Sequence, residues 1–406
     1  MAEKDAGGTV RPLQGIRVLD LSRVLAGPSC TMMLADLGAD VIKVENPGAG
    51  DDTRSWGTEV APRQSSYYLS ANRNKRDIAL DFTRPEAQGI VRDLAGTSDV
   101  LVENFKLGGL DRFGLDYTAL SALNPRLIYC SISGYGRTGP AAARPGYDFV
   151  AQAEAGLMSI NGEEGGPPLK VGYATVDLMT GMYAGQSVLA ALIAREKTGR
   201  GQHIDLALYD CAVATLSYLA TGVMASGRAP TRYGNAHPDV VPYELFPAAD
   251  GSLVVAIGND TQFRKFCLQV LERPDMAEDP RYGSNPQRVK HRPDLSAAIA
   301  AVLKQRPRAA WLKAMEAAGV PGGEVRTVPE VLAAPETAAR GMVCRVPHPT
   351  AGSVGLLASP MKFSDTPVRP PEAPPLIGQH TDEVLTERLG LSAARIAELR
   401  RLGAVA

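Results

Sequence analysis

Asp177 is the side chain whose place in the sequence most clearly suggests chemistry. A strand is predicted over Leu169–Ala174 and a long helix over Val176–Lys197, so Asp177 falls at the start of that helix. Free N–H groups and the helix dipole stabilise a carboxylate there, which predicts an ionised, nucleophilic group at neutral pH. An ordinary helix N-cap would show the same pattern, and the pattern alone leaves both interpretations open. The neighbouring residues are small: Gly172, Ala174, Gly181 and Gly185.

A cationic cluster over Asn72–Arg76 comes directly before a predicted strand over Ile78–Phe82. Its arginines and lysine suggest a small anionic ligand such as phosphate. A solvated surface loop is the alternative interpretation.

A glycine-rich segment, Gly134–Gly139, follows a predicted strand over Leu127–Ile132 and matches the GxGxxG pattern. A dinucleotide site requires a helix to open there, but Pro140 comes next, so we expect a glycine-rich loop instead. The sequence contains neither a P-loop nor a nucleophile-elbow motif. Its histidines are too scattered for a local metal pair, and no metal site is expected: His203, His237, His291, His348 and His380.

Composition narrows the function classes. The 406 residues carry 43 Lys plus Arg against 44 Asp plus Glu, a net charge of −1, which argues against a nucleic-acid partner. The longest charge-free apolar stretch, Cys211–Gly227, is interpreted as a buried core helix, so no membrane partner is expected. Five scattered cysteines and an N-terminus without an apolar leader indicate a cytoplasmic protein.

Strand and helix signals alternate through the first half of the chain and predict a parallel sheet in an α/β fold. The character changes after about residue 225, where Asp250-Gly251 predicts a hairpin and several helices follow. We therefore expect a large domain over residues 1–227, a smaller α+β domain over 228–325, and a segment over 326–406 that returns to complete the large domain.

Nine segments spread over nearly the whole chain match one known family in residues and in order. They are RVLAGP (Arg23–Pro28), Gly38–Arg54, NRNKRDIALDF (Asn72–Phe82), VENF (Val102–Phe105), LDRFG (Leu110–Gly114), SISGYGRTGP (Ser131–Pro140), Gly146–Ala153, KTGRGQHID (Lys197–Asp205) and Pro374–Leu385. Together these segments resemble the class III coenzyme A transferases of the CaiB/BaiF type, and Gly234–Phe246 is most similar to the succinyl-CoA:glutarate CoA-transferase branch.

The resemblance implies a Rossmann-like large domain built from both chain ends, a small α+β domain and an interlocked homodimer. It also implies transfer of CoA from an acyl-CoA, for which we expect succinyl-CoA, to a carboxylic acid, for which we expect a C4–C6 dicarboxylate such as glutarate. Coenzyme A is then a substrate, and no tightly bound cofactor is expected. Asp177 matches the family's catalytic aspartate, which forms acyl anhydride and aspartyl-CoA thioester intermediates.

The same resemblance assigns binding residues. Positions that approach CoA are Leu25, Ala26, Leu80, Asp81, Phe82, Thr83, Asn104, Phe105, Lys106, Arg112, Tyr147 and Asp148. Trp56 matches an active-site wall, and candidates for the acceptor's second carboxylate are Arg54, Arg73, Arg232 and His237. Asn46 stands where some relatives carry a phosphate-binding arginine, and Ala236–Asp239 replaces their glycine loop.

Two other functions remain open from the sequence. One is an α-methylacyl-CoA racemase-like isomerase, which needs a histidine where this chain has Tyr147. The other is a non-catalytic CoA-binding protein.

Overall fold

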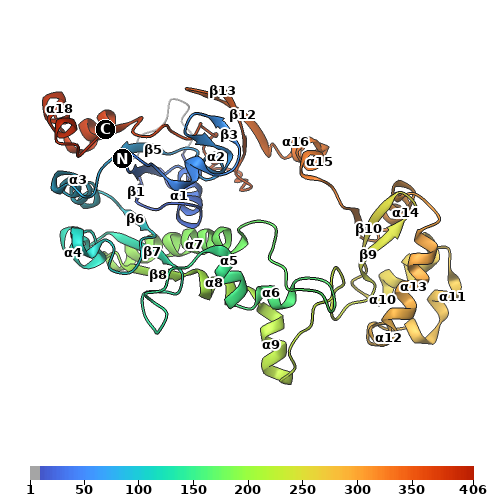
Figure 1. The fold of residues 1–406 in the computed structure, drawn as a ribbon. Helices are drawn as coiled ribbons and strands as arrows, with labels where there is room; N and C mark the ends of the chain where they lie inside the picture. The colour runs from blue at the N-terminus through green and yellow to red at the C-terminus, as the bar shows by residue number, and fades with distance from the viewer. Residues whose placement is uncertain (1–9) are drawn as a thin grey trace. The chain divides into compact units, whose positions relative to one another are not determined.

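The computed structural model describes residues 10–406, which divide into two compact units (Figure 1). Unit 1 combines the described part of Met1–Leu157 with Lys170–Ser226 and Pro335–Ala406. Unit 2 combines Met158–Leu169 with Gly227–Ala334. These limits differ from the expected ones at two places, because 158–169 falls in unit 2 and the chain returns at Pro335 rather than at 326. The first difference has a physical cause: the Gly234 N–H donates to the Gly162 carbonyl inside unit 2.

A six-stranded sheet forms the centre of unit 1, and every neighbouring pair in it is parallel, as the alternating pattern predicts. The order is β5-β2-β1-β6-β7-β8, so the direction of winding reverses between β1 and β6. The strands are β1 (Arg17–Asp20), β2 (Asp40–Glu45), β5 (Arg76–Ala79), β6 (Val100–Glu103), β7 (Ile128–Ser133) and β8 (His203–Ala207).

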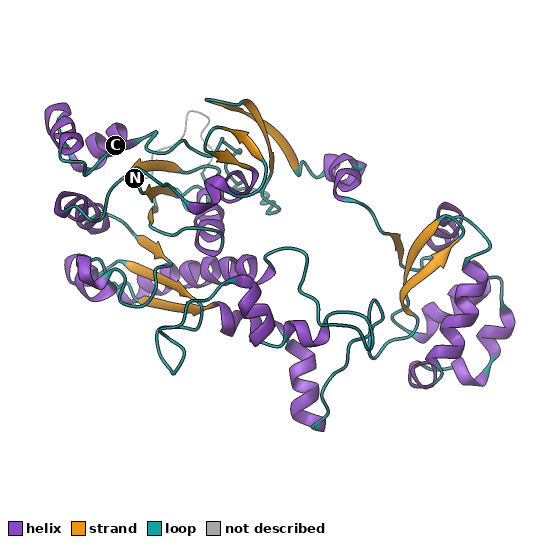
Figure 2. Cartoon of the chain, viewed as in Figure 1, coloured by secondary structure: helices purple, strands orange, loops and turns teal. Residues whose placement is uncertain are grey.

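Helices cover both faces of this sheet, and the strands are accordingly apolar on both sides. Successive strand residues point to opposite faces: Val18 belongs to one buried cluster and Leu19 to the other. Figure 2 shows the helices on either side of the strands. The first face is covered by α1 (Ala26–Asp36), α5 (Asp148–Glu154), α7 (Thr175–Thr198) and α8 (Leu208–Thr215), and the second by α3 (Pro85–Gly96), α4 (Tyr117–Leu123), α17 (Thr381–Leu389) and α18 (Ala393–Arg401).

Helices α1 and α7 pack unusually closely because α7 carries glycines at the contact. A Cβ on Gly181 would lie 2.7 Å from the Ala26 carbonyl oxygen, and one on Gly185 would overlap the Met33 side chain. The small residues near Asp177 in the sequence thus bring its helix against the first turn of α1.

The end of the chain completes unit 1. Leu80 and Val405 form an isolated antiparallel bridge, and the Asp81 N–H donates to the Ala404 carbonyl. Figure 1 shows the red C-terminal helix α18 beside the blue strands of the N-terminal part. Smaller elements of unit 1 are β3 (Glu59–Ala61), β4 (Gln64–Ser65), α2 (Ser66–Ala71), α16 (Pro335–Ala339), β12 (Val343–His348) and β13 (Gly352–Leu357), and α6 (Leu157–Ile160) lies at the boundary between the units.

Two expected elements are wrong. Residues 169–174 form no strand, because the chain there runs as an irregular loop into α7. Cys211–Gly227 is not one buried helix: α8 and α9 (Ser217–Ser226) meet at a bend of 70°, and α9 has no buried residue. By length and composition α7, or α8 with α9 as one broken span, would suffice to cross a membrane. Half of the apolar window of α7 is buried in unit 1, which is typical of a core helix.

Unit 2 has its own buried cluster around Trp311 and Phe266. Its antiparallel sheet includes the predicted hairpin at Asp250-Gly251. The elements are β9 (Tyr243–Ala248), β10 (Gly251–Ala256), β11 (Gly322–Glu324), α10 (Asp260–Lys265), the π-helix η3 (Phe266–Val270), α11 (Pro274–Glu278), α12 (Asn285–Lys290), α13 (Arg292–Leu303), α14 (Arg308–Ala318) and α15 (Val328–Ala333).

Candidate active site

A cavity of about 220 Å³ lies at the carboxyl ends of β1, β6 and β7 in unit 1, and Asp177 is one of its walls. This edge, at the reversal of strand order, is where open α/β sheets bind their ligands. The predicted residues that line the cavity are Leu25, Ala26, Asn104, Phe105, Lys106 and Tyr147.

Asp177 is the third residue of α7, and its carboxylate does not cap the helix. Asp148, the first residue of α5, does so instead: its Oδ1 accepts from the backbone N–H groups of Val176 at 2.7 Å and Asp177 at 3.2 Å. Gln152 donates to the other oxygen of Asp148 and accepts from the Val171 N–H, which fixes the loop before α7. Asp148 therefore supports the start of α7 and is not among the residues that line the cavity, and its assignment as a CoA contact stays a prediction.

The sequence predicts an ionised Asp177 at neutral pH, whereas the surroundings of the carboxyl group disfavour its anion. Burial, and then the neighbouring charge of Asp148, raise the pKa of Asp177 to about 7. Within residues 10–406, no side chain or backbone group donates a hydrogen bond to its carboxylate that would offset this. The group is therefore divided between acid and anion near neutral pH, and such a pKa suits a residue that must alternate between free and acylated forms.

Trp56 contacts Tyr67, and its assignment as an active-site wall stays a prediction. The rings of Trp56 and Tyr67 meet edge to face with centroids 5.5 Å apart. Burial, and then the charges of Asp177, Asp148 and Asp51, raise the pKa of Tyr67. The sequence analysis missed Tyr67, because nothing in the local pattern of α2 distinguishes it from a core tyrosine.

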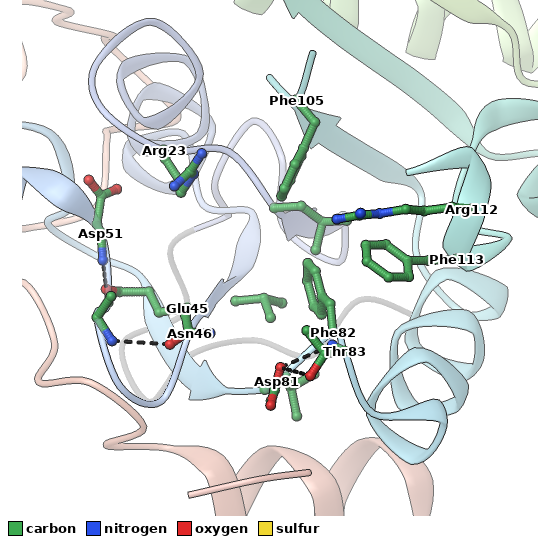
Figure 3. Close-up of a pocket in the computed structure, with 15 residues that line it drawn as sticks. Arg23, Glu45, Asn46, Asp51, Asp81, Phe82, Thr83, Phe105, Arg112 and Phe113 are labelled. Atoms are coloured by element: carbon green, nitrogen blue, oxygen red, sulfur yellow. Dashed lines mark hydrogen bonds between the residues drawn. The ribbon is translucent and has the colours of Figure 1, made fainter. Parts of the chain in front are cut away.

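A second cavity, of about 370 Å³, adjoins the first (Figure 3). The predicted residues Leu80, Asp81, Phe82, Thr83 and Arg112 line it, together with Phe105, which both cavities share. Figure 3 shows Phe82, Phe105 and Phe113 around the hollow with Arg112 beside them. Phe82 and Phe105 lie 6.3 Å apart, and the Arg112 guanidinium lies 4.4 Å from the Phe113 ring. An aromatic pocket with one stacked arginine suits a nucleotide base and its phosphate.

Arg54 and Arg73 do not serve a substrate carboxylate. The Arg54 guanidinium is 5% exposed and binds both oxygens of Glu45, whose pKa it lowers to about 2 together with Lys43, against the effect of burial. Arg73 is also buried, and its guanidinium donates to both carboxylate oxygens of Asp36. Both arginines are therefore structural, since their donors are already engaged by buried carboxylates.

The whole cluster over Asn72–Arg76 has the same role, so neither the phosphate site nor the solvated loop is correct. Asn72 to Lys75 are buried, and Arg76 pairs with Asp40 at the sheet edge. Lys75 donates to Asp20 at 3.0 Å and to the Pro28 carbonyl in the first turn of α1 at 2.9 Å. Burial lowers the pKa of Lys75 to about 8 although Asp20 opposes the shift. The cluster thus holds α1 to the sheet from beneath the cavities.

The remaining candidates lie in unit 2. Arg232 donates to the carbonyl oxygens of Ser159 and Gly166 at 3.3 and 2.5 Å and thereby holds the segment 158–169. His237 accepts the Asp239 N–H at Nδ1, and its ring lies 5.4 Å from Tyr243. Their role toward a substrate stays a prediction.

The glycine-rich segment forms a loop after β7, as expected. Gly134 lies against Gly146, where a Cβ on either would come within 2.6 Å of the other's Cα. This contact draws the loop before α5 over the carboxyl end of β7 and shapes one side of the first cavity. Across residues 10–406, no cluster of three or more potential metal ligands is present.

Comparison with known proteins identifies the family of the chain. The succinyl-CoA:glutarate CoA-transferase of Homo sapiens is 42% identical over 396 residues, covering 98% of this chain and 90% of that protein. The succinate–glutarate CoA-transferase of Agrobacterium fabrum is 45% identical over 382 residues, covering 93% and 95%. A solved CAIB/BAIF family protein from Brucella suis is 42% identical, with a TM-score of 0.83 over 94% of this chain and 100% of that chain. A solved hypothetical protein from Mycobacterium tuberculosis is 31% identical, with a TM-score of 0.82 over 92% and 99%. CoA-transferase family III matches residues 13–381, and the chain belongs to this family of CoA-transferring enzymes.

Proposed function

We propose that this enzyme transfers CoA from succinyl-CoA to glutarate or another C4–C6 dicarboxylate. The relatives from Homo sapiens and Agrobacterium fabrum carry that activity in their names, and each matches nearly the full chain. The observation that carries the proposal is the Asp177 carboxylate, which forms part of a cavity wall and receives no hydrogen bond from any described residue.

The proposed reaction proceeds through Asp177 in four exchanges. Its carboxylate attacks the succinyl-CoA carbonyl, the C–S bond breaks, and CoA thiolate leaves a mixed succinyl-aspartyl anhydride. The thiolate attacks the aspartyl carbonyl, which releases succinate and leaves an aspartyl-CoA thioester. A glutarate carboxylate attacks that thioester, the C–S bond breaks, and CoA thiolate leaves a glutaryl-aspartyl anhydride. The thiolate then attacks the glutaryl carbonyl and expels the Asp177 carboxylate, which yields glutaryl-CoA and the free enzyme.

The cavity supports these exchanges because it retains the thiolate beside its electrophile. A carboxylate whose pKa is about 7 is a better leaving group than a thiol and a better nucleophile than an ordinary aspartate. Neither half of the exchange is then strongly favoured, as a reversible transfer between two acids requires.

The test is a transfer assay with succinyl-CoA and a panel of mono- and dicarboxylic acids of two to eight carbons. We expect the highest kcat/KM for glutarate or a neighbour of similar length, with succinate released in equal amount to the acyl-CoA formed. Hydrolysis without transfer, or no turnover with any acid, would refute the proposal. Incubating a 2-methylacyl-CoA in deuterium oxide controls for the racemase alternative, and we expect no exchange at the α-carbon.

We also propose that the enzyme is a cytoplasmic homodimer with interlocked chains. Helix α9 exposes Tyr218, Val223 and Met224, the last at 79%, and none of its residues is buried. A second copy that passes through each chain would cover this apolar surface. Two differently tagged dimer pools should form no hybrid over hours when mixed, and rapid hybrid formation would contradict interlocking.

A further inference from the structure

Arg23 and Phe105 are shared by the two cavities of unit 1. One cavity contains Asp177, and the other contains the phenylalanines with Arg112. Arg23 follows β1 and Phe105 follows β6, so the junction lies at the reversal of strand order. Arg23 is therefore the cation at the point where one hollow passes into the other.

The following step rests on the proposed function. An acyl-CoA has its thioester at one end, its adenine nucleotide at the other, and a diphosphate between them. With the thioester at Asp177, the pantetheine arm occupies the first cavity and the nucleotide the aromatic one. The diphosphate then lies at the junction, where two negative charges require a cationic partner.

Hydrogen bonds hold the backbone of Arg23 in place, whereas its side chain is half-exposed to solvent. The Arg23 N–H donates to Asn104 Oδ1 at 2.9 Å, and Asn104 Nδ2 donates back to the Arg23 carbonyl at 2.7 Å. The next residue, Val24, has φ 71°, rare for a β-branched side chain, and its N–H is held by both oxygens of Asp51 at 3.3 Å. The base of Arg23 is thus positioned while the guanidinium stays half-exposed over the Phe105 ring, 5.6 Å away.

Asp52 is the carboxylate that Arg23 binds in the structure, with Nη1 3.2 Å from Oδ2. Both side chains are about half-exposed, at 50% and 48%, so water screens the pair and little is lost when it opens. A diphosphate offers more charge and more acceptor oxygens than Asp52 and can replace it.

Other polar groups of the cavities are less suited to this role. Asn46 carries no charge, and its Oδ1 already accepts from the N–H groups of Gly48 and Ala49. Arg144 lines only the cavity that contains Asp177, where it lies over Tyr135. Arg112 lines only the aromatic cavity, and Lys106 lines only the one that contains Asp177.

We propose that Arg23 binds the diphosphate of CoA and that Asp52 is a competing anion that releases it. Arg23 thereby supplies the positive charge that the position of Asn46 lacks. Asp52 in turn sets an upper limit on the affinity for CoA, since it competes for Arg23 and repels the diphosphate.

The experiment measures binding of CoA, dephospho-CoA and pantetheine by calorimetry to wild type, Arg23→Gln, Asp52→Asn and Arg395→Gln. Arg23→Gln should lower the affinity for CoA and for dephospho-CoA by the same factor, about tenfold or more, and leave the affinity for pantetheine unchanged. Asp52→Asn should raise the affinity for CoA and for dephospho-CoA about two- to fivefold. It should reduce the salt dependence of their binding less than Arg23→Gln does. Arg395→Gln is the matched control, because Arg395 forms a similar half-exposed pair with Glu398 far from the cavities in sequence.

Several outcomes would overturn the inference. If Arg23→Gln lowered the affinity for pantetheine equally, Arg23 would only maintain the shape of the cavity. If it lowered the affinity for CoA alone, Arg23 would bind the 3′-phosphate and not the diphosphate. Unchanged affinity in Arg23→Gln, while wild type binds CoA, refutes the inference and leaves the proposed function intact. Failure of wild type to bind CoA would refute the proposed function itself and this inference with it.

Discussion

Asp148 holds the helix of Asp177 by two backbone hydrogen bonds, at 2.7 Å from Val176 and 3.2 Å from Asp177, and opposes the ionisation of the same residue. The two effects act on different atoms. The hydrogen bonds satisfy N–H groups at the start of α7, while the negative charge of Asp148 raises the pKa of the Asp177 carboxyl. Asp148 therefore determines both the position of Asp177 and how readily Asp177 gives up its proton.

Asp177→Asn and Asp177→Ala should abolish transfer and leave CoA binding largely intact. The substituted side chain cannot form an anhydride, whereas the cavity walls that hold CoA come from other elements. Hydroxylamine added during turnover should attack the activated carbonyl of Asp177, displace CoA or the acid, and leave a hydroxamate on the wild-type peptide that contains Asp177, as mass spectrometry would show. Residual activity within tenfold of wild type would contradict the covalent mechanism.

The raised pKa of Asp177 predicts two opposite pH dependences. Attack requires the anion, so kcat should rise with pH through about 7. Because the folded pKa exceeds the unfolded value of 3.8, the folded chain binds the proton more tightly, and stability falls as pH rises from about 4 to about 7. Asp177→Asn removes this penalty and should raise the free energy of unfolding by up to about 4 kcal/mol above pH 7.

Denaturant unfolding of wild type and Asp177→Asn at pH 5 and pH 8 checks the stability prediction. The advantage of the asparagine variant should be clearly larger at pH 8, and an advantage that does not change with pH would contradict it. Asp205→Asn serves as the control, because Asp205 is a carboxylate of unit 1 outside both cavities.

Asp148→Asn and Asp148→Ala should separate the two effects of Asp148. The amide of asparagine keeps one oxygen to accept from the α7 backbone but has no charge, so the pH midpoint of kcat should move below 7 with little loss of stability. Alanine removes the acceptor too and should cost about 0.5–2 kcal/mol of unfolding free energy as well. The pH–rate profile and the unfolding curve of each variant provide the measurement. Identical pH midpoints in all three proteins would show that Asp148 only supports the helix.

The parallel sheet and the place of Asp177 at a helix start could be predicted from the sequence, because both follow from local pattern. Apolar runs such as Asp40–Glu45 alternate with helical segments, and this alternation defines βαβ units without any knowledge of strand order. The binding positions came from the resemblance, which carries information about distant contacts that a single pattern lacks.

The ionic partners could not be predicted in this way. Arg73, Lys75 and Arg76 lie within four residues of one another, but they bind carboxylates 36 to 55 residues earlier, on α1 and the neighbouring strands. Arg76 also binds Glu383 and Glu387 of α17, which lie 307 and 311 residues later. A charged run gives no sign of such partners, so the cluster resembled a ligand site or a surface loop. The pKa of Asp177 depends likewise on Asp148, 29 residues away, which only the packing of α5 against α7 brings close.

His237 remains the candidate for the second carboxylate of the acceptor. A dicarboxylate in the site exposes a charge that is costly to desolvate without a donor. The Nδ1 of His237 accepts the Asp239 N–H, which assigns the ring proton to Nε2, and Arg292 holds the segment through the carbonyls of His237 and Pro238. These contacts fix the His237 ring within unit 2, and its role toward an acceptor carboxylate stays a prediction.

His237→Ala should therefore raise KM for glutarate at least about tenfold more than KM for pentanoate, with the affinity for CoA unchanged. Arg232→Ala should show the same preference but also a lower stability, because Arg232 holds the carbonyls of Ser159 and Gly166. Selectivity is consequently judged on His237, with His291→Ala in the same unit as the control. Initial-rate assays with both acids decide the matter. Equal losses for glutarate and pentanoate would mean that His237 supports the fold of unit 2, and the distal carboxylate would have to be bound elsewhere.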